Sequence, residues 1–247
     1  MTTLKQAEDK MEVDATLREA YLFEAANKKV MLIAVTEQSR LGQIEEKPDF
    51  EYYRARATKP GTFNNQFDRF GNCVSVTVCH HTHTVMFGPT SQIQMYPEGH
   101  GLGPALMARV IDWLHRKGLQ NYVIQPGMLS SHTVNGDSER LRRNQFYMKF
   151  GFVLSGSDKN GQSAQGLDVL SGHFSAPTVG VLKVQKPYLD RLVPCSDFYS
   201  KLSTERYVAQ QNVWDIQSHV AWAKGSSWAA LLKRIVLFIM NSPIDKR

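Results

Sequence analysis

The fold of this chain is decided by the stretch YPEGHGLG, residues 96–103, and by the helical pattern that follows it over residues 102–117. Apolar side chains recur there at helical spacing, and Gly118 supplies the stop signal. A glycine-rich turn between a strand and a helix lets backbone N–H groups approach an anion closely. The positive end of the helix dipole adds to the attraction. We therefore expect the backbone from Gly99 to Gly103 to bind phosphate.

A dinucleotide-binding turn is the alternative for these glycines. That turn has the order Gly-x-Gly-x-x-Gly and an acidic residue at the end of the next strand. Here the glycines are closer together, several expected strands come before the turn, and the strand at 122–124 ends in Gln125 and Pro126. These differences argue against a dinucleotide.

A second informative stretch is NQFYMKFGF, residues 144–152, which ends a helix expected to begin at Asp137 or Ser138. Tyr147 lies one helix beyond the glycine turn, where a phenol can serve as a proton donor. An aromatic core residue is the other interpretation. We favour the functional one, because Phe146 and Phe150 already supply apolar bulk.

Together the two stretches resemble the acyl-CoA signature of the Gcn5-related N-acetyltransferase (GNAT) superfamily. The resemblance covers residues 30–184 in the order of elements and residues 96–152 in specific motifs. The matching residues are Pro97, Glu98, Gly99, Gly101, Leu102, Gly103 and Leu106 in the turn, and Asn144, Phe146, Tyr147, Gly151 and Phe152 after it. The turn is also shorter than the family's, and Glu98 stands where the family has Arg or Gln beside the CoA pyrophosphate. A carboxylate at that place repels phosphate unless it points away.

The resemblance implies an α/β (α+β) fold with a mixed, mostly antiparallel central sheet flanked by helices. It also implies attack of an acceptor amine on an acyl-CoA thioester, with Tyr147 as proton donor to the departing sulfur. A backbone N–H near Met95 or Tyr96 would polarise the thioester carbonyl. The carrier-binding residues that the resemblance implies are Tyr96, Gly99, His100, Gly101, Leu102, Gly103 and Asn144.

The general base is open. His132 and Asp137 lie in the loop where acceptors commonly approach, and we take them with Tyr147 as the candidate catalytic residues. Glu98, His100 and Ser130 are on the same side of the expected sheet. For each of these loop residues, we favour the interpretation as a solvated side chain.

A metal site is a further interpretation, carried by the run CHHTH at residues 79–83. If the strand from Cys73 continues, Cys79, His81 and His83 project on one face, because side chains alternate along a strand. Three such groups can bind zinc or iron. A polar hairpin end with incidental histidines is the alternative.

Composition and charge restrict the class of protein. The 247 residues carry a net charge of +6 and only three cysteines, which argues against a disulfide framework and favours a reducing compartment. Residues 1–8 show no signal-peptide core, and Lys233 and Arg234 interrupt the apolar stretch at 228–240. We therefore expect a cytoplasmic protein without a membrane partner.

The remaining patterns give a coarse map of elements. We expect helices at 4–28, 197–222 and 227–240, a loop at 60–72 and a mobile loop at 156–172. The expected strands are 30–35, 51–58, 73–79, 84–87, 92–96, 122–124, 152–154 and 179–184. This map predicts an N-terminal helix over 1–29, a GNAT-like domain over 30–185, and a helical extension over 186–247 packed on that domain.

Three functions are compatible with these features. The first is an N-acyltransferase with an acyl-CoA-like donor and an amine acceptor. The second resembles the phage Mom proteins, which modify adenine in DNA and depart from ordinary acetyl-CoA use; Glu98, the basic charge and the C-terminal helices favour such a DNA or RNA partner. The third is a non-catalytic binding module with the same fold, which Glu98 also favours.

Overall fold

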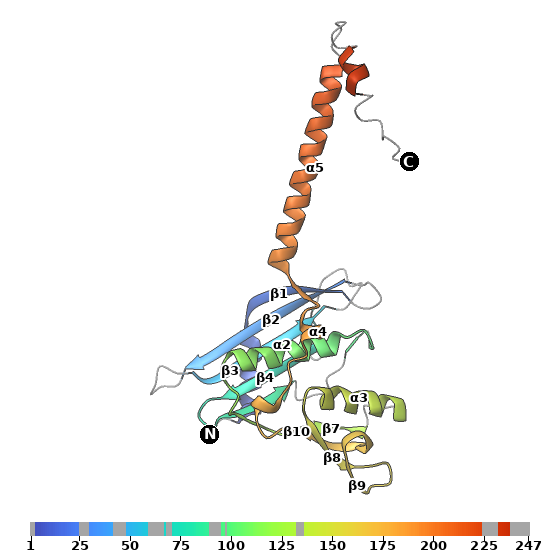
Figure 1. Ribbon diagram of the computed structural model, residues 1–247. Coiled ribbons are helices and arrows are strands. Elements are labelled where there is room, and N and C mark those ends of the chain that lie inside the picture. Colours follow the sequence, from blue (N-terminus) through green and yellow to red (C-terminus); the bar gives the residue numbers. More distant parts are fainter. Residues whose placement is uncertain are drawn as a thin grey trace. The chain divides into compact units, whose positions relative to one another are not determined.

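Strand β4 (Cys73–Cys79) lies inside the main sheet of a computed structural model of the chain (Figure 1). All seven of its residues are buried, and its side chains alternate between two covered faces. Val74, Val76 and Val78 join the main apolar core. Ser75 points to the other face, where it donates a hydrogen bond to Glu8. The alternating pattern at 73–79 thus predicted the strand, and the structure adds that both of its faces are covered.

The structure describes residues 3–24, 30–41, 48–58, 67, 71–88, 95–96, 98–131, 136–223 and 232–237. The chain divides into one unit of residues 1–195 and a second of residues 196–247. The first unit is a mixed α/β structure with a large, mostly antiparallel sheet, as expected from the sequence.

The main sheet has the strand order β11-β1-β2-β3-β4-β5-β6. Its other strands are β1 (Thr16–Glu24), β2 (Val30–Leu41), β3 (Pro48–Ala57), β5 (Thr84–Gly88), β6 (Val123–Ile124) and β11 (Leu192–Pro194). All neighbours pair antiparallel except β5 and β6, which are parallel. That parallel pairing joins Thr84 to Val123 and Val85 to Ile124.

Beyond Ile124 the chain leaves the main sheet and enters a second one, of order β7-β10-β8-β9. Its strands are β7 (Gly127–Leu129), β8 (Val153–Ser157), β9 (Ser163–Gln165) and β10 (Ser171–Ser175). The two sheets therefore diverge immediately after the short parallel pairing. This division sets the position of the candidate site.

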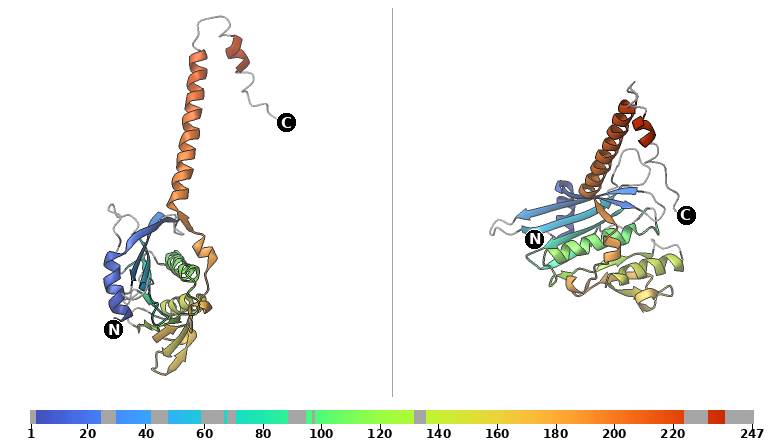
Figure 2. Two further views of the ribbon diagram at one scale, coloured as in Figure 1. Left: turned by 90° about the vertical axis from the view of Figure 1, so that its left-hand side faces the viewer. Right: turned by 45° about the horizontal axis from the view of Figure 1, so that its top comes forward.

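Helices cover both faces of the main sheet (Figure 2, left). Helix α2 (Leu102–Arg116) buries its apolar face against one side of the sheet, and α1 (Leu4–Asp14) packs on the other through Leu4, Ala7 and Met11. A capping box between Thr3 and Gln6 begins α1. Helix α3 (Asp137–Lys149) lies with the second sheet.

The prediction of one helix over residues 4–28 was wrong beyond Asp14. Residues 16–24 form β1, which pairs along its length with β2 and at its far end with β11. Glu19, Tyr21 and Phe23 alternate toward α2, where Arg109 contacts the first two of them. No Pro or Gly marks the change of structure in the sequence, so the pairing itself decides it.

Two further expectations were wrong. The mobile loop predicted at 156–172 is ordered into β8, β9, the 3₁₀ turn η2 (Gly166–Asp168) and the start of β10. The strand predicted at 179–184 begins as another 3₁₀ turn, η3 (Val179–Val181), whose amides donate to the carbonyls of Tyr122 and Gln120. It packs across the end of α2 rather than beside a strand.

Most of the other boundaries agree with the structure within a few residues, although β2 runs on to Leu41 and the sequence map missed β7, β11 and helix α4 (Lys186–Leu189). Residues 92–94 of the expected strand at 92–96 and most of the loop at 60–72 fall outside the described residues, and Met95 and Tyr96 are not in a strand. The predicted packing of the C-terminal extension stays a prediction.

The second unit contains helix α5 (Cys195–Ala223), which begins at the last residue of the first unit. The side chains of residues 196–218 are exposed, including Phe198, Tyr199 and Trp214. Residues 232–237 are also helical. In the part of the chain that the structure describes, no helix combines the length and apolar character needed to cross a membrane.

Buried Glu8 gives a pH-dependent prediction. It is 4% exposed, and burial raises its pKa, because a carboxylate is poorly solvated there. Between about pH 4.5 and this raised pKa, the unfolded chain has released a proton that the native protein still holds, so its stability falls as pH rises. Glu8→Gln does not titrate. We expect it to gain stability relative to the parent between about pH 4 and pH 7, on the order of 1 kcal/mol, in chemical denaturation.

Glu12→Gln is the matched control, because Glu12 on the same helix pairs with the buried guanidinium of Arg54. That change leaves Arg54 with one charge partner fewer, so stability at neutral pH should fall. A Glu8→Gln variant that weakens relative to the parent as pH rises would contradict the assignment.

Candidate active site

The glycine turn before α2 has the backbone shape that an anion site needs. Gly99 and Gly101 both adopt left-handed conformations, with φ of +78° and +84°. Residues with side chains rarely adopt such values, so glycine is required for this path of the chain. Gly101 is also the N-cap of α2, and no side chain caps the helix. Amides that follow a left-handed residue point into a shared concavity, which accepts anions.

The second feature of the turn is the hydrogen bonding of the backbone amides at this end of α2. Among the described residues, none accepts a hydrogen bond from the backbone N–H of Gly101, Leu102 or Gly103. Pro104 has no N–H to satisfy. The first hydrogen bond of the helix runs from Ala105 to the carbonyl of Gly101. The turn thus presents unpaired donors together with the positive end of the helix dipole.

Two arginines from distant parts of the chain hold the turn. Arg191 donates to the carbonyl of His100 at 3.2 Å and to that of Glu24 at 2.7 Å, so it joins the turn to the end of β1. Its guanidinium also lies beside Gly101, where a Cβ would overlap with it. Arg142 on α3 pairs with Glu98, so the carboxylate next to the turn has a cationic partner.

Tyr147 occupies the buried face of α3, 7% exposed. Its ring stacks on Phe174 of β10, with centroids 4.3 Å apart, and meets the edge of Phe152. Gly127 on β7 makes room for the ring of Phe174, because a Cβ there would overlap with it. Burial raises the pKa of Tyr147 to about 12. The phenol therefore stays protonated near neutral pH, and no described residue accepts a hydrogen bond from it.

Tyr147 and the turn come from elements in direct contact. The ring of Phe146 lies 3.6 Å from the position that a Cβ on Gly103 would take, so α3 touches the first turn of α2. Phe146 is also in edge contact with Tyr147. The structure thus places the predicted proton donor one residue away from the wall of the predicted phosphate turn.

The side chain of Asn144, expected to contact the carrier, makes its hydrogen bonds within the protein. It is fully buried, and its amide nitrogen donates to the carbonyls of Leu167 and Val169 at 3.0 and 2.8 Å and to Gly166 at 3.3 Å. Its side-chain oxygen accepts from Arg143 at 3.0 Å. The three contacts of the amide nitrogen fix the η2 turn against α3.

The other candidate residues are more scattered. Asp137 is exposed at the start of α3, pairs with Arg140, and lies ten residues before Tyr147, about 15 Å along the helix. His132 falls outside the described residues. The amide of Tyr96 donates to the side chain of Asn72 at 2.5 Å, so that amide is not available to polarise a thioester carbonyl.

The histidine run does not form the expected metal site. Strand β4 ends at Cys79 and residues 80–83 turn, with His83 at a φ of +50°, so alternation stops before the histidines. Cys79 is buried while His81 and His83 are exposed. Within the described ranges, no group of three His, Cys, Asp or Glu side chains is arranged to hold a metal ion. His80 instead contacts Tyr122 and Glu51.

No protein-family model matches this chain, and neither the curated proteins nor the solved structures compared with it include a significant match. The site is therefore argued from the residues of this chain, and the GNAT resemblance stays a prediction. Sequence reasoning missed Arg142, Arg191 and Phe174 as parts of the site. Only Arg142 had a signal, since it belongs to the basic run at 140–143.

The role of Asn144 can be tested directly. Asn144→Ala leaves buried carbonyls of the η2 turn without their donor, so we expect a loss of about 2–3 kcal/mol in the free energy of unfolding. Gln145→Ala is the control, because Gln145 is exposed on the same helix and should change stability by less than about 0.5 kcal/mol. Urea denaturation measures both. Equal stability of the two variants would contradict the structural role.

Proposed function

We propose that this chain is an acyltransferase of the GNAT type, which moves an acyl group from an acyl-CoA-like donor to an acceptor amine. One observation carries the proposal. The unpaired amides of the turn at residues 99–103 lie against the helix that bears the buried phenol of Tyr147, where the two sheets diverge. A phosphate cradle and a protonated donor in adjacent elements suit a phosphate-bearing carrier whose reactive end is a thioester.

The turn supplies what a diphosphate needs. The amides of Gly101, Leu102 and Gly103 can each donate to a phosphate oxygen, and the dipole of α2 favours the negative charge. Glu98 would oppose the carrier on its own. Its pairing with Arg142 offsets that charge, so the departure from the family's Arg or Gln is met by an arginine from α3.

The chemistry requires one bond to form and one to break. The nitrogen of the acceptor amine attacks the thioester carbonyl carbon, giving a tetrahedral intermediate. This collapses with cleavage of the C–S bond, and the nitrogen releases its proton to solvent or a base. Tyr147 donates a hydrogen bond to the departing sulfur, which stabilises the thiolate until it is protonated. With a pKa near 12, Tyr147 keeps its proton throughout the working range.

The nucleic-acid alternative gains no specific observation from the described residues. Arg140 and Arg143 on α3 donate to backbone carbonyls of the 166–170 segment, and Arg142 pairs with Glu98. Each of these basic groups is already engaged within the protein. We therefore make the acyl transfer the single proposal.

Carrier binding is tested by substitution of the turn. Gly101→Ala forces a side chain into a left-handed conformation and against Arg191, and we expect at least a tenfold loss of affinity for CoA in isothermal titration. Gly118→Ala is the matched control. It has a φ of +74° at the other end of α2, with no atom near its Cβ, so it carries similar backbone strain but should bind CoA like the parent.

Two outcomes would contradict the proposed binding of the carrier at the glycine turn. One is absence of heat when the parent protein is titrated with CoA and with acetyl-CoA. The other is an equal loss of affinity in both glycine variants, which would trace the effect to stability alone.

The hydrogen-bond donor to the departing sulfur is tested with Tyr147→Phe. The change keeps the stacking on Phe174 and removes only the hydroxyl, so CoA affinity should stay within twofold of the parent. We expect thiol release from acetyl-CoA, measured with spermidine and a lysine peptide as acceptors, to slow by about 10²-fold. Tyr122→Phe is the control, because its hydroxyl contacts His80 away from the turn. A Tyr147→Phe variant as fast as the parent would remove the phenol from the mechanism.

A further inference from the structure

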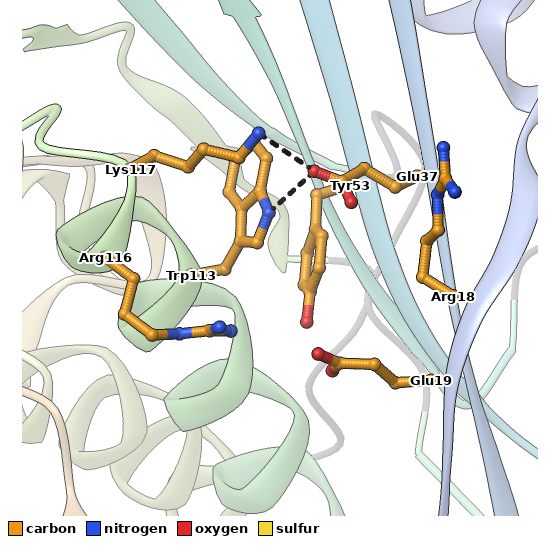
Figure 3. A pocket seen from close by; sticks show the side chains of 7 residues that line it. All are labelled: Arg18, Glu19, Glu37, Tyr53, Trp113, Arg116 and Lys117. Atoms are coloured by element: carbon orange, nitrogen blue, oxygen red, sulfur yellow. Dashed lines mark hydrogen bonds and ion pairs between the residues drawn. The ribbon is translucent and has the colours of Figure 1, made fainter.

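A second pocket lies at the opposite end of α2 from the glycine turn (Figure 3). It has a volume of about 240 Å³. Its walls come from β1, β2, β3 and the last turn of α2. Tyr53 and Trp113 form an aromatic pair in it, with ring centroids 4.6 Å apart and planes 20° from parallel.

The two carboxylates of the pocket are already paired. Glu19 accepts hydrogen bonds from the hydroxyl of Tyr21 at 2.7 Å and from Arg109. Burial by itself would raise the pKa of Glu19, but these two donors lower it. Glu37 accepts from the indole nitrogen of Trp113 at 3.0 Å and from the ammonium of Lys117 at 3.1 Å. Each negative charge therefore has a cation beside it.

The groups left without partners are hydrogen-bond donors. The hydroxyl of Tyr53 is buried, in a residue that is 1% exposed, and it has no hydrogen-bond partner. Burial also raises the pKa of this phenol, so it remains a donor. The Nε of Arg116 donates a hydrogen bond to Asp112 at 2.9 Å. Among the described residues, its two terminal nitrogens have no hydrogen-bond acceptor. Arg18 has no partner among the residues described by the structure.

Figure 3 shows how these donors lie. The hydroxyl of Tyr53 points toward the end of the pocket where the guanidinium of Arg116 and the carboxylate of Glu19 lie. Arg18 lies at the other wall, beside Glu37. The ring of Tyr53 belongs to the apolar core, and its hydroxyl points toward this end of the pocket, with a cation to one side. A buried donor of this kind is costly to leave unpaired, and a ligand oxygen restores its hydrogen bond.

We propose that this pocket is a second binding site, for a small molecule that carries a carboxylate or phosphate group. The oxyanion accepts hydrogen bonds from Tyr53 and Arg116, and Arg18 adds positive charge. Glu19 does not exclude an anion, because Tyr21 and Arg109 hold its charge. The volume limits the ligand to a few heavy atoms beyond the oxyanion, since sites for drug-sized molecules run from about 300 Å³ upward. The site is independent of the proposed acyl transfer.

Trp113 supplies a local signal for the test, because it lines the pocket and the other tryptophans are Trp214, Trp222 and Trp228. Replacing those three with Phe in the full-length chain leaves Trp113 as the single tryptophan, which is excited selectively on the long-wavelength side of tyrosine absorption. This protein is titrated with sodium succinate and, separately, with sodium phosphate, each against sodium chloride of equal ionic strength. We expect a saturable change with at least one of the two, and that one identifies the oxyanion.

Tyr53→Phe in the same background is the decisive variant. It keeps the stacked ring and removes the unpartnered hydroxyl, so its melting temperature without ligand should equal or exceed that of the parent. Its affinity for the oxyanion should fall at least fivefold, and Arg116→Gln should weaken binding as well. Gly101→Ala, which alters the turn at the other end of α2, should leave the Trp113 signal unchanged.

Three results would overturn the proposal. The first is a fluorescence response to both oxyanions no larger than that to chloride, which would mean a pocket filled by solvent only. The second is an unweakened response in Tyr53→Phe. The third is loss of the response in Gly101→Ala, which would assign the anion to the glycine turn. CoA titration of Tyr53→Phe, expected to match the parent, separates this outcome from any failure of the acyltransferase proposal.

Discussion

Parallel pairing between β5 and β6 lasts for two residues, and the place where it stops determines where the groups of the candidate site lie. After Ile124 the chain moves to the second sheet, and α3 follows it there. The strand end before α2 belongs to the first sheet. The glycine turn begins the helix that covers the main sheet, the helix of Tyr147 lies with the second sheet, and Phe146 contacts Gly103 where the two helices meet. A longer parallel ladder would keep the chain in the main sheet beyond Ile124.

The sequence was most informative where local pattern and tertiary packing agree. The alternation at 73–79 and the helical spacing at 102–117 each bury a face that their own residues specify, so β4 and α2 were predicted within a residue. Residues 16–24 carry a mixed pattern without a breaker, and their strand depends on hydrogen bonds to β2. The polar segment at 156–172 likewise owes its strands to pairing between β8 and β10. Pairing partners distant in sequence leave no local pattern.

The same reasoning separates the predictable and unpredictable parts of the site. The left-handed turn could be predicted from Gly99 and Gly101, because few other residues adopt that backbone conformation. The partners of the two arginines could not be predicted in this way. Arg142 pairs with Glu98 across 44 positions of the chain, and Arg191 donates to the backbone carbonyl of His100 across 91 positions. The expected role of Asn144 came from resemblance alone, and the three carbonyls that its amide contacts lie 22 to 25 positions further along the chain. The residues that line the second pocket come from β1, β2, β3 and α2, so no single stretch of sequence predicts the pocket.

The two halves of the candidate site are anchored to different sheets. Arg191 fastens the glycine turn to the end of β1 in the main sheet, whereas stacking on Phe174 of β10 fastens Tyr147 to the second. The angle between the sheets therefore sets the gap between the phenol and the amides. The short β5–β6 ladder is in the position of a hinge, and hinges of few residues are where proteins absorb rigid-body rotation. In the acyltransferase that we propose, both halves would hold the carrier, so its release would require that angle to widen and would depend on the stiffness of this ladder.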